Sequence, residues 1–188
     1  MDPSNDPHRV LVHRAIPTDP AVRSSGSLFL TEAEGQCGTP SRRLLLAGLF
    51  PAPPAIAVRM GVVPGTDLVS RRRLMLVDGI PLRIATSWFL PDAPEAAELS
   101  ANSFLEGGLQ ELFDRHGRVF GRAEETLVAR LPSRDEAALL QIDTAEPVVE
   151  IVRTSVDNKL KPVHTLQTVC AGTRHVFDVG HFPGDRVF

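Results

Sequence analysis

The sequence has few cysteines, since only Cys37 and Cys170 occur among its 188 residues and they lie far apart. They form no CxxC pattern, and this argues against a disulfide framework and against a zinc site. Such sparing use of cysteine is typical of the reducing cytoplasm, where we expect the protein to work. We expect it to need no metal ion and no cofactor.

The sequence also lacks an excess of positive charge and a long apolar run. Twenty Lys and Arg residues against 23 Asp and Glu residues leave a net charge of −3. A dedicated nucleic-acid binder usually carries a general positive field, which is absent here. The most apolar stretch, Leu44 to Val58, contains three prolines and is too short to span a bilayer. We therefore expect no direct binding to nucleic acid and no membrane segment.

The chain divides into a leader, one domain and a tail. Residues 1–24 are polar and contain four prolines, so we interpret them as a leader, partly ordered around Arg9–His13, and see no signal peptide in them. Residues 25–182 have the ordinary apolar content of one globular domain, and 183–188 form a tail. We find no space for a winged-helix pattern, which takes roughly sixty residues of paired helices and a hairpin.

An Asp-Gly pair between two β-rich runs predicts a hairpin, with strands over Leu68–Val77 and Leu82–Phe89. Two registers are open. A two-residue turn pairs Val77 with Ile80 and places Arg73 opposite Ile84, whereas a three-residue turn places Arg73 opposite Ala85. A shift of one residue exchanges the two faces of a strand, so the register decides which face Arg73 occupies.

Capping-box spacing predicts two helix starts, one at Ser103 with Glu106 and one at Ser133 with Glu136. An apolar stripe follows the first start, and Gly117 is expected to end that helix. The stripe consists of Leu105, Leu109, Leu112 and Phe113.

The remaining elements are short strands and one short helix, and together they predict an α+β fold built on an antiparallel sheet. The helix is expected over Ala55–Met60, and the strands over Arg43–Phe50, Val119–Leu131, Val148–Val156, Pro162–Cys170 and Arg174–Val179.

Several fragments, in this order and spacing, resemble the UTRA domain of GntR-type bacterial regulators of the HutC kind. They are Arg71–Pro81, Ala85–Pro91, Ala123–Thr126, Pro147–Arg153 with Lys161–Val163, and Gly172–Phe177. The resemblance implies a chorismate-lyase-like fold, with about six antiparallel strands and short helices packed on them. It also implies a homodimer that binds a small effector, usually behind a winged-helix domain that we do not find in this chain.

The resemblance places an arginine that grips an anion at Arg73, although a solvated charge within Arg71–Arg73 is the simpler interpretation. Five other positions, Met75, Ala85, Gly108, His164 and Cys170, lack a charge, a hydroxyl group or an aromatic ring that sugar-phosphate-binding members have there. The whole predicted ligand-binding set is Arg73, Met75, Ala85, Ser87, Gly108, Glu124, His164 and Cys170. Because these replacements remove charges and hydroxyl groups, we expect a larger, partly apolar ligand with one anionic or carbonyl group.

Two other functions are open. One is a cofactor-independent lyase, cyclase or isomerase on the same scaffold, with Cys170 as nucleophile, His164 as base and Glu124 as a further group. Glu124 and Glu125 are adjacent, so only one of them can face the pocket. The other is a protein-binding dimerisation partner without a ligand.

Overall fold

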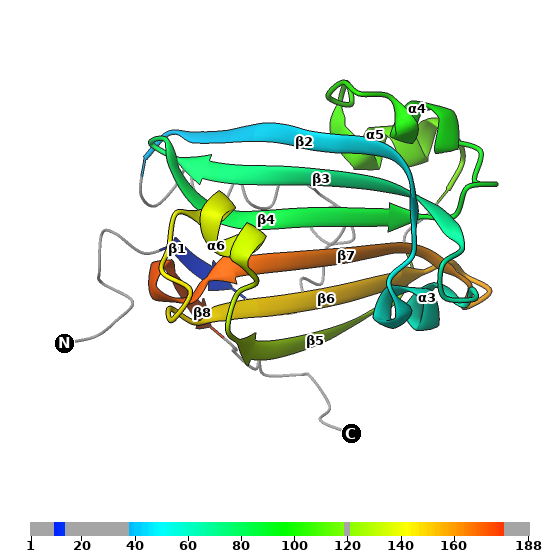
Figure 1. The fold of residues 1–188 in the computed structure, drawn as a ribbon. Helices are drawn as coiled ribbons and strands as arrows, with labels where there is room; N and C mark the ends of the chain where they lie inside the picture. The colour runs from blue at the N-terminus through cyan, green and yellow to red at the C-terminus, as the bar shows by residue number, and fades with distance from the viewer. Residues whose placement is uncertain (1–9, 14–37, 119–120, 179–188) are drawn as a thin grey trace, which may run out of the picture.

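A computed structural model describes residues 10–13, 38–118 and 121–178, and Figure 1 shows its fold. Six antiparallel strands form the main sheet in the order β2-β3-β4-β7-β6-β5. The strands are β2 (Pro40–Pro51), β3 (Asp67–Val77), β4 (Ile80–Phe89), β5 (Ala123–Arg130), β6 (Val148–Val156) and β7 (Pro162–Ala171). The predicted α+β fold with a six-stranded antiparallel sheet is confirmed.

Short helices and a second small sheet complete the described part of the chain. The helices are α3 (Pro54–Met60), α4 (Ala96–Ser100), α5 (Gly108–Arg115) and α6 (Arg134–Leu140), with a 3-10 turn at Gly172–Arg174. Strand β1 (Val10–His13) pairs in parallel with β8 (His175–Asp178). Thus β1 lies within the expected leader, whereas the rest of the leader and the tail lie outside the described residues. No helix in the described ranges is long and apolar enough to cross a membrane.

The β3–β4 hairpin contains both of the pairs that the sequence left open. Val77 pairs with Ile80 across a two-residue turn, and both turn residues have positive φ as a type I′ turn requires. Further along, Arg73 nevertheless pairs with Ala85. The register shifts by one residue between these pairs, at Leu82, and this bulge provides the extra residue that a longer turn would have supplied.

Alternation along the strands gives the sheet two faces, which we name after Arg73 and Trp88. In Figure 1, α3 and α6 lie in front of the sheet on the Trp88 face, and β1 and β8 lie behind it. The Trp88 face packs on buried residues of α3 and α6, namely Ile56, Ala57, Met60 and Leu140. The Arg73 face packs on buried residues of α4 and α5, namely Leu99, Leu109, Leu112 and Phe113.

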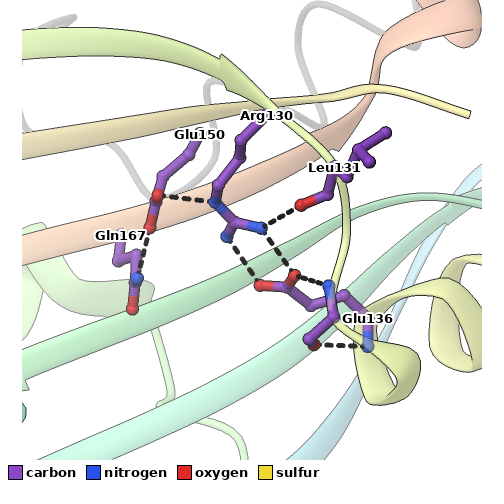
Figure 2. A network of polar contacts seen from close by, with 6 residues as sticks. Arg130, Leu131, Glu136, Glu150 and Gln167 are labelled. Atoms are coloured by element: carbon purple, nitrogen blue, oxygen red, sulfur yellow. Dashed lines mark hydrogen bonds and ion pairs between the residues drawn. The ribbon is translucent and has the colours of Figure 1, made fainter. Parts of the chain in front are cut away.

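A polar network fixes α6 to the edge of the sheet (Figure 2). The Arg130 guanidinium donates two hydrogen bonds to Glu136, at 2.7 and 2.8 Å, and one to Glu150 at 2.8 Å. Gln167 on β7 donates to the other oxygen of Glu150. Glu136 also closes the predicted capping box, since it accepts from the Ser133 backbone N–H at 2.7 Å while Ser133 Oγ accepts from its own N–H at 3.2 Å.

The capping box predicted at Ser103 and Glu106 is wrong. Helix α5 begins at Gly108, after an N-cap at Gly107 that has no side-chain capping bond. Both glycines have positive φ, so the backbone turns sharply at the point where the helix was expected to run on. The Ser103 carbonyl instead accepts a hydrogen bond from Arg71.

The two capping-box serines give a matched pair of variants. Ser133→Ala removes a helix N-cap bond, so we expect the free energy of unfolding to fall by about 1 kcal/mol. Ser103→Ala removes an exposed hydroxyl that caps no helix, so we expect a change within about 0.5 kcal/mol. Urea denaturation of both variants measures this difference, and equal losses would contradict the assignment of the caps.

Candidate ligand-binding site

A pocket opens on the Arg73 face between the sheet and the chain that joins α4 to α5. Its empty space is about 440 Å³, counting the part that opens to solvent. Strands β2, β3 and β4, the α4–α5 connection and α5 all contribute to it. The lining residues are Arg42, Arg71, Arg73, Ser87, Phe89, Phe104, Leu105 and Leu109. Three cations and one hydroxyl therefore face four apolar side chains.

Arg73 lies in the sheet floor of this pocket. Its Nη2 donates to Ser87 Oγ on the neighbouring strand at 2.9 Å. Its Nε is buried and has no hydrogen-bond partner within the described part of the chain. Burial first, and then the neighbouring charges of Arg71 and Arg42, lower the pKa of Arg73 to about 10. Arg73 is therefore still a cation at neutral pH, with a buried donor that no described protein group satisfies.

Arg71 differs from Arg73, because its guanidinium group donates hydrogen bonds to backbone carbonyl oxygens. It is only 3% exposed. Its Nη1 donates to the carbonyl oxygens of Leu99 at 2.7 Å and Ala101 at 2.9 Å, and its Nη2 donates to that of Ser103 at 2.5 Å. These bonds tie the connection after α4 to β3. They thereby hold Phe104 beside the pocket.

The pocket concentrates positive charge. Within the described residues, none of the guanidinium groups of Arg42, Arg71 and Arg73 forms an ion pair with a carboxylate. Arg42 instead lies 4.8 Å from the centroid of the Phe104 ring. Burial, and then the charge of Arg42, lowers the pKa of Arg71. An anion placed among these groups would relieve their mutual repulsion.

Of the eight predicted site residues, Arg73 and Ser87 line the pocket and Gly108 directly precedes the lining residue Leu109. Met75, Ala85 and Cys170 lie further along the Arg73 face and are buried. Phe177 of β8 packs against the cluster that contains Met75 and Ala85, so β8 covers this part of the face.

His164 lies behind the pocket wall. Its ring stacks on Phe89, with the centroids 4.7 Å apart and the planes 8° from parallel. Phe89 itself lines the pocket. The position of His164 is therefore that of a support for the wall.

Glu124 lies on the opposite face of the sheet. It pairs with Thr154, which pairs in turn with Thr165 and so with Trp88. It is exposed and forms an ion pair with Arg122 at 3.5 Å. Glu125 has the register of the Arg73 face, but it sits on the edge strand β5 and does not line the pocket.

The structure does not bring together the three residues considered for catalysis. His164 and Cys170 share one face of β7 but are six residues apart, which is roughly 20 Å along a strand. A base and its nucleophile need hydrogen-bond reach, and Glu124 lies across the sheet from both. Among the described residues, no three His, Cys, Asp or Glu side chains could hold a metal ion.

The lining residues that sequence reasoning missed come from several segments. Two of them, Arg71 and Phe89, alternate with the predicted Arg73 and Ser87, so the period of two could have identified them. Leu105 and Leu109 belong to the apolar stripe predicted after Ser103. Two more, Arg42 and Phe104, meet only because β2 and the α4–α5 connection approach each other in the fold. No local pattern signals that meeting.

The chain matches the family model of the UTRA domain over residues 35–176. An uncharacterized HTH-type transcriptional regulator of Streptomyces coelicolor is 32% identical over 124 residues, which are 64% of this chain and 46% of the relative. A similar regulator of Rhizobium meliloti is 30% identical over 125 residues, 66% of this chain and 50% of the relative. The chain thus spans about half the length of these curated relatives.

Solved structures show the same fold. PhnF from Mycobacterium smegmatis superposes with a TM-score of 0.71 at 20% identity, over 93% of this chain and 72% of PhnF. The C-terminal domain of Yurk from Bacillus subtilis superposes with a TM-score of 0.65 at 18% identity, over 74% of this chain and 95% of that domain. The chorismate-lyase-like architecture implied by the sequence motifs is confirmed.

The environment of His164 predicts a pH dependence of stability. Burial first, and then the charges of Arg73 and Arg153, lower its pKa to about 3. In the unfolded chain a histidine titrates near 6.5, so the unfolded state binds more protons between these values. Stability contributed by the neutral ring is therefore lost as pH falls below about 6.5, by up to about 1.4 kcal/mol per pH unit.

His164→Gln removes this titration, so its free energy of unfolding should fall less steeply with pH than that of the wild type. Urea denaturation at a series of pH values between 7 and 4.5 compares the two slopes. Parallel slopes would mean that the pKa of His164 is the same in the folded and the unfolded chain, and this would contradict its burial as a neutral ring.

Proposed function

The chain belongs to the UTRA domain family, and we propose that it is the effector-binding domain of a GntR-type regulator of the HutC kind. Its effector, in this proposal, is a small molecule with one anionic group on an apolar body. The observation that carries the proposal is Arg73, a cation whose buried Nε has no described partner and which lines a pocket without a carboxylate. The relatives that share the domain are transcription regulators.

The polar side of the pocket suits a planar anion. A guanidinium group presents donors in a fork that matches a carboxylate, and such charge-assisted bonds are stronger than neutral ones. Arg73 offers Nε together with an Nη group, while Arg42 and Arg71 raise the local positive potential. A carbonyl oxygen could accept the same bonds, but it would leave this potential uncompensated.

The remaining walls suit an apolar body. Two phenylalanines and two leucines, Phe89, Phe104, Leu105 and Leu109, face the arginines. A sugar ring against these walls would leave hydroxyl groups unpaired, which is costly in a desolvated site. The body of an aromatic or alicyclic acid has no hydroxyl group that would be left unpaired. This supports a partly apolar acid over a phosphosugar.

The α4–α5 connection is the segment through which we expect ligand binding to affect the rest of the protein. It carries Phe104 and Leu105 into the pocket and is tied to β3 by Arg71. A ligand that packs on Phe104 would therefore restrict the motion of this connection. We propose that the domain works as a homodimer in the cytoplasm, makes no direct contact with DNA, and transmits effector binding through α4 and α5.

The pocket is tested with aromatic carboxylates, starting from benzoate, phenylacetate and naphthoate, each beside its uncharged amide. Thermal shift finds the acid that stabilises most, because a ligand that binds the folded state raises apparent stability. Arg73→Ala should then weaken binding of that acid by roughly 1.5–3 kcal/mol, about ten- to a hundredfold in Kd by calorimetry.

Arg72→Ala is the matched control, since Arg72 is adjacent in sequence but pairs with Thr86 and so faces the other side of the sheet. It should leave the affinity unchanged. Equal losses at Arg72 and Arg73, or an amide that binds as tightly as its acid, would contradict an anion site at Arg73.

A further inference from the structure

On its exposed side the pocket is lined by an aromatic ring with a cation over it. Phe104 is 46% exposed and belongs to none of the apolar clusters of the described residues. The guanidinium carbon of Arg42 lies 4.8 Å from the centroid of this ring. Both side chains line the pocket. A half-exposed ring and its cation are therefore in a position to contact the body of a bound ligand.

The backbone that carries each of these two side chains is fixed. Arg42 lies on β2 opposite Met75, so its side chain is on the Arg73 face and diagonal to Arg73 itself. Phe104 belongs to the α4–α5 connection, which Arg71 ties to β3. The cation and the ring therefore meet before a ligand arrives, and this reduces the conformational freedom that is lost on binding.

The diagonal arrangement of Arg42 and Arg73 allows one ligand to contact both. Diagonal neighbours on an antiparallel pair of strands lie roughly 7–8 Å apart. A single ring with an attached carboxylate can span this separation. The two groups also interact through their charges, since burial, then the charge of Arg71 and then that of Arg42 lower the pKa of Arg73. A carboxylate bound to Arg73 therefore leaves the rest of a small acid beside Arg42.

A cation at this position distinguishes an aromatic body from a saturated one. The face of an aromatic ring carries partial negative charge and attracts a cation within about 6 Å of its centroid. A guanidinium is planar and stacks on such rings, so one of its faces can lie over Phe104 while the other meets a second ring. A cyclohexane ring offers no negative face. Arg42 therefore attracts an aromatic ring more strongly than a saturated ring of the same size.

We propose that Arg42 and Phe104 select an aromatic ring, so that the ligand of this site is an aromatic carboxylate rather than a saturated acid of the same size. This inference rests on the proposed function and narrows it, since the apolar walls alone accept both kinds of body. Arg73 then sets the requirement for a negative charge, and Arg42 sets the requirement for a ring. Arg71 is unsuited to this second role, because it is 3% exposed and bound to backbone carbonyls.

Calorimetry with three acids that differ only in the ring tests this selection. Phenylacetate is compared with cyclohexylacetate, which has no aromatic ring, and with pentafluorophenylacetate, in which the fluorine atoms reverse the charge of the ring face. All three are anions at neutral pH, so Arg73 treats them alike. Phenylacetate should bind the wild type more tightly than the other two by about two- to thirtyfold, which is the size of one cation–π contact.

Arg42→Gln, with its circular dichroism unchanged, should remove the preference for phenylacetate, because glutamine is polar but carries no charge. Arg43→Gln is the matched control, since Arg43 is the next residue on β2 and pairs with Leu74 on the opposite face of the sheet. It should leave the preference as it is in the wild type. Phe104→Leu keeps an apolar side chain but removes the ring beneath Arg42, so it should reduce the preference. A preference that survives Arg42→Gln would overturn the selection by Arg42.

Two further results would overturn the inference in distinguishable ways. If the wild type binds the three acids equally but still prefers phenylacetate to phenylacetamide, the ring selection fails and the anion site at Arg73 stands. If phenylacetamide binds as tightly as phenylacetate, the proposed function fails and the ring selection fails with it. A diacid, 1,4-phenylenediacetate, checks the other use of Arg42. Tighter binding of this diacid that Arg42→Gln abolishes, without a change in the order of the three monoacids, would make Arg42 a second anion site instead.

Discussion

The structure of the site depends on one buried arginine, Arg71, whose guanidinium donates to one carbonyl oxygen of α4 and to two of the chain that follows α4. Burial of a charge is costly unless the charge is hydrogen-bonded, and backbone carbonyls provide these bonds for Arg71 without neutralising it. The connection is thereby fixed over β3, and the positive charge is kept beside the pocket. Arg73, two residues along the same face, is left to bind something else.

The two faces of the sheet differ in how their charged groups are paired. On the Trp88 face, α3 and α6 pack against the sheet, and Arg130 is paired with the carboxylates of Glu136 and Glu150. On the Arg73 face, β8 packs on the cluster around Met75 and Ala85, and the pocket lies elsewhere on the face, with Arg42, Arg71 and Arg73 but no carboxylate in its lining. Strand alternation creates this division, because neighbouring arginines such as Arg72 and Arg73 must point to opposite sides.

Sequence patterns predicted the features that depend on interactions between residues close together in the chain. The Asp78-Gly79 turn, the Ser133 cap and the bounds of β6 are confirmed, since turn and capping chemistry act within a few residues. The sequence could not predict the bulge that places Arg73 opposite Ala85, because packing of the whole sheet selects it. The cap at Ser103 failed for a related reason. Arg71 takes the Ser103 carbonyl, and a partner 32 residues away leaves no local trace.

The central claim is that Arg73 is the open anion site and Arg71 is structural. The most direct measurement follows the arginine Nε–Hε resonances in a ¹⁵N NMR spectrum while benzoate is added, with benzamide as the uncharged control. We predict that the Arg73 resonance shifts with benzoate and not with benzamide, while the Arg71 resonance changes little. An unmoved Arg73 resonance, or equal shifts with both compounds, would contradict the account.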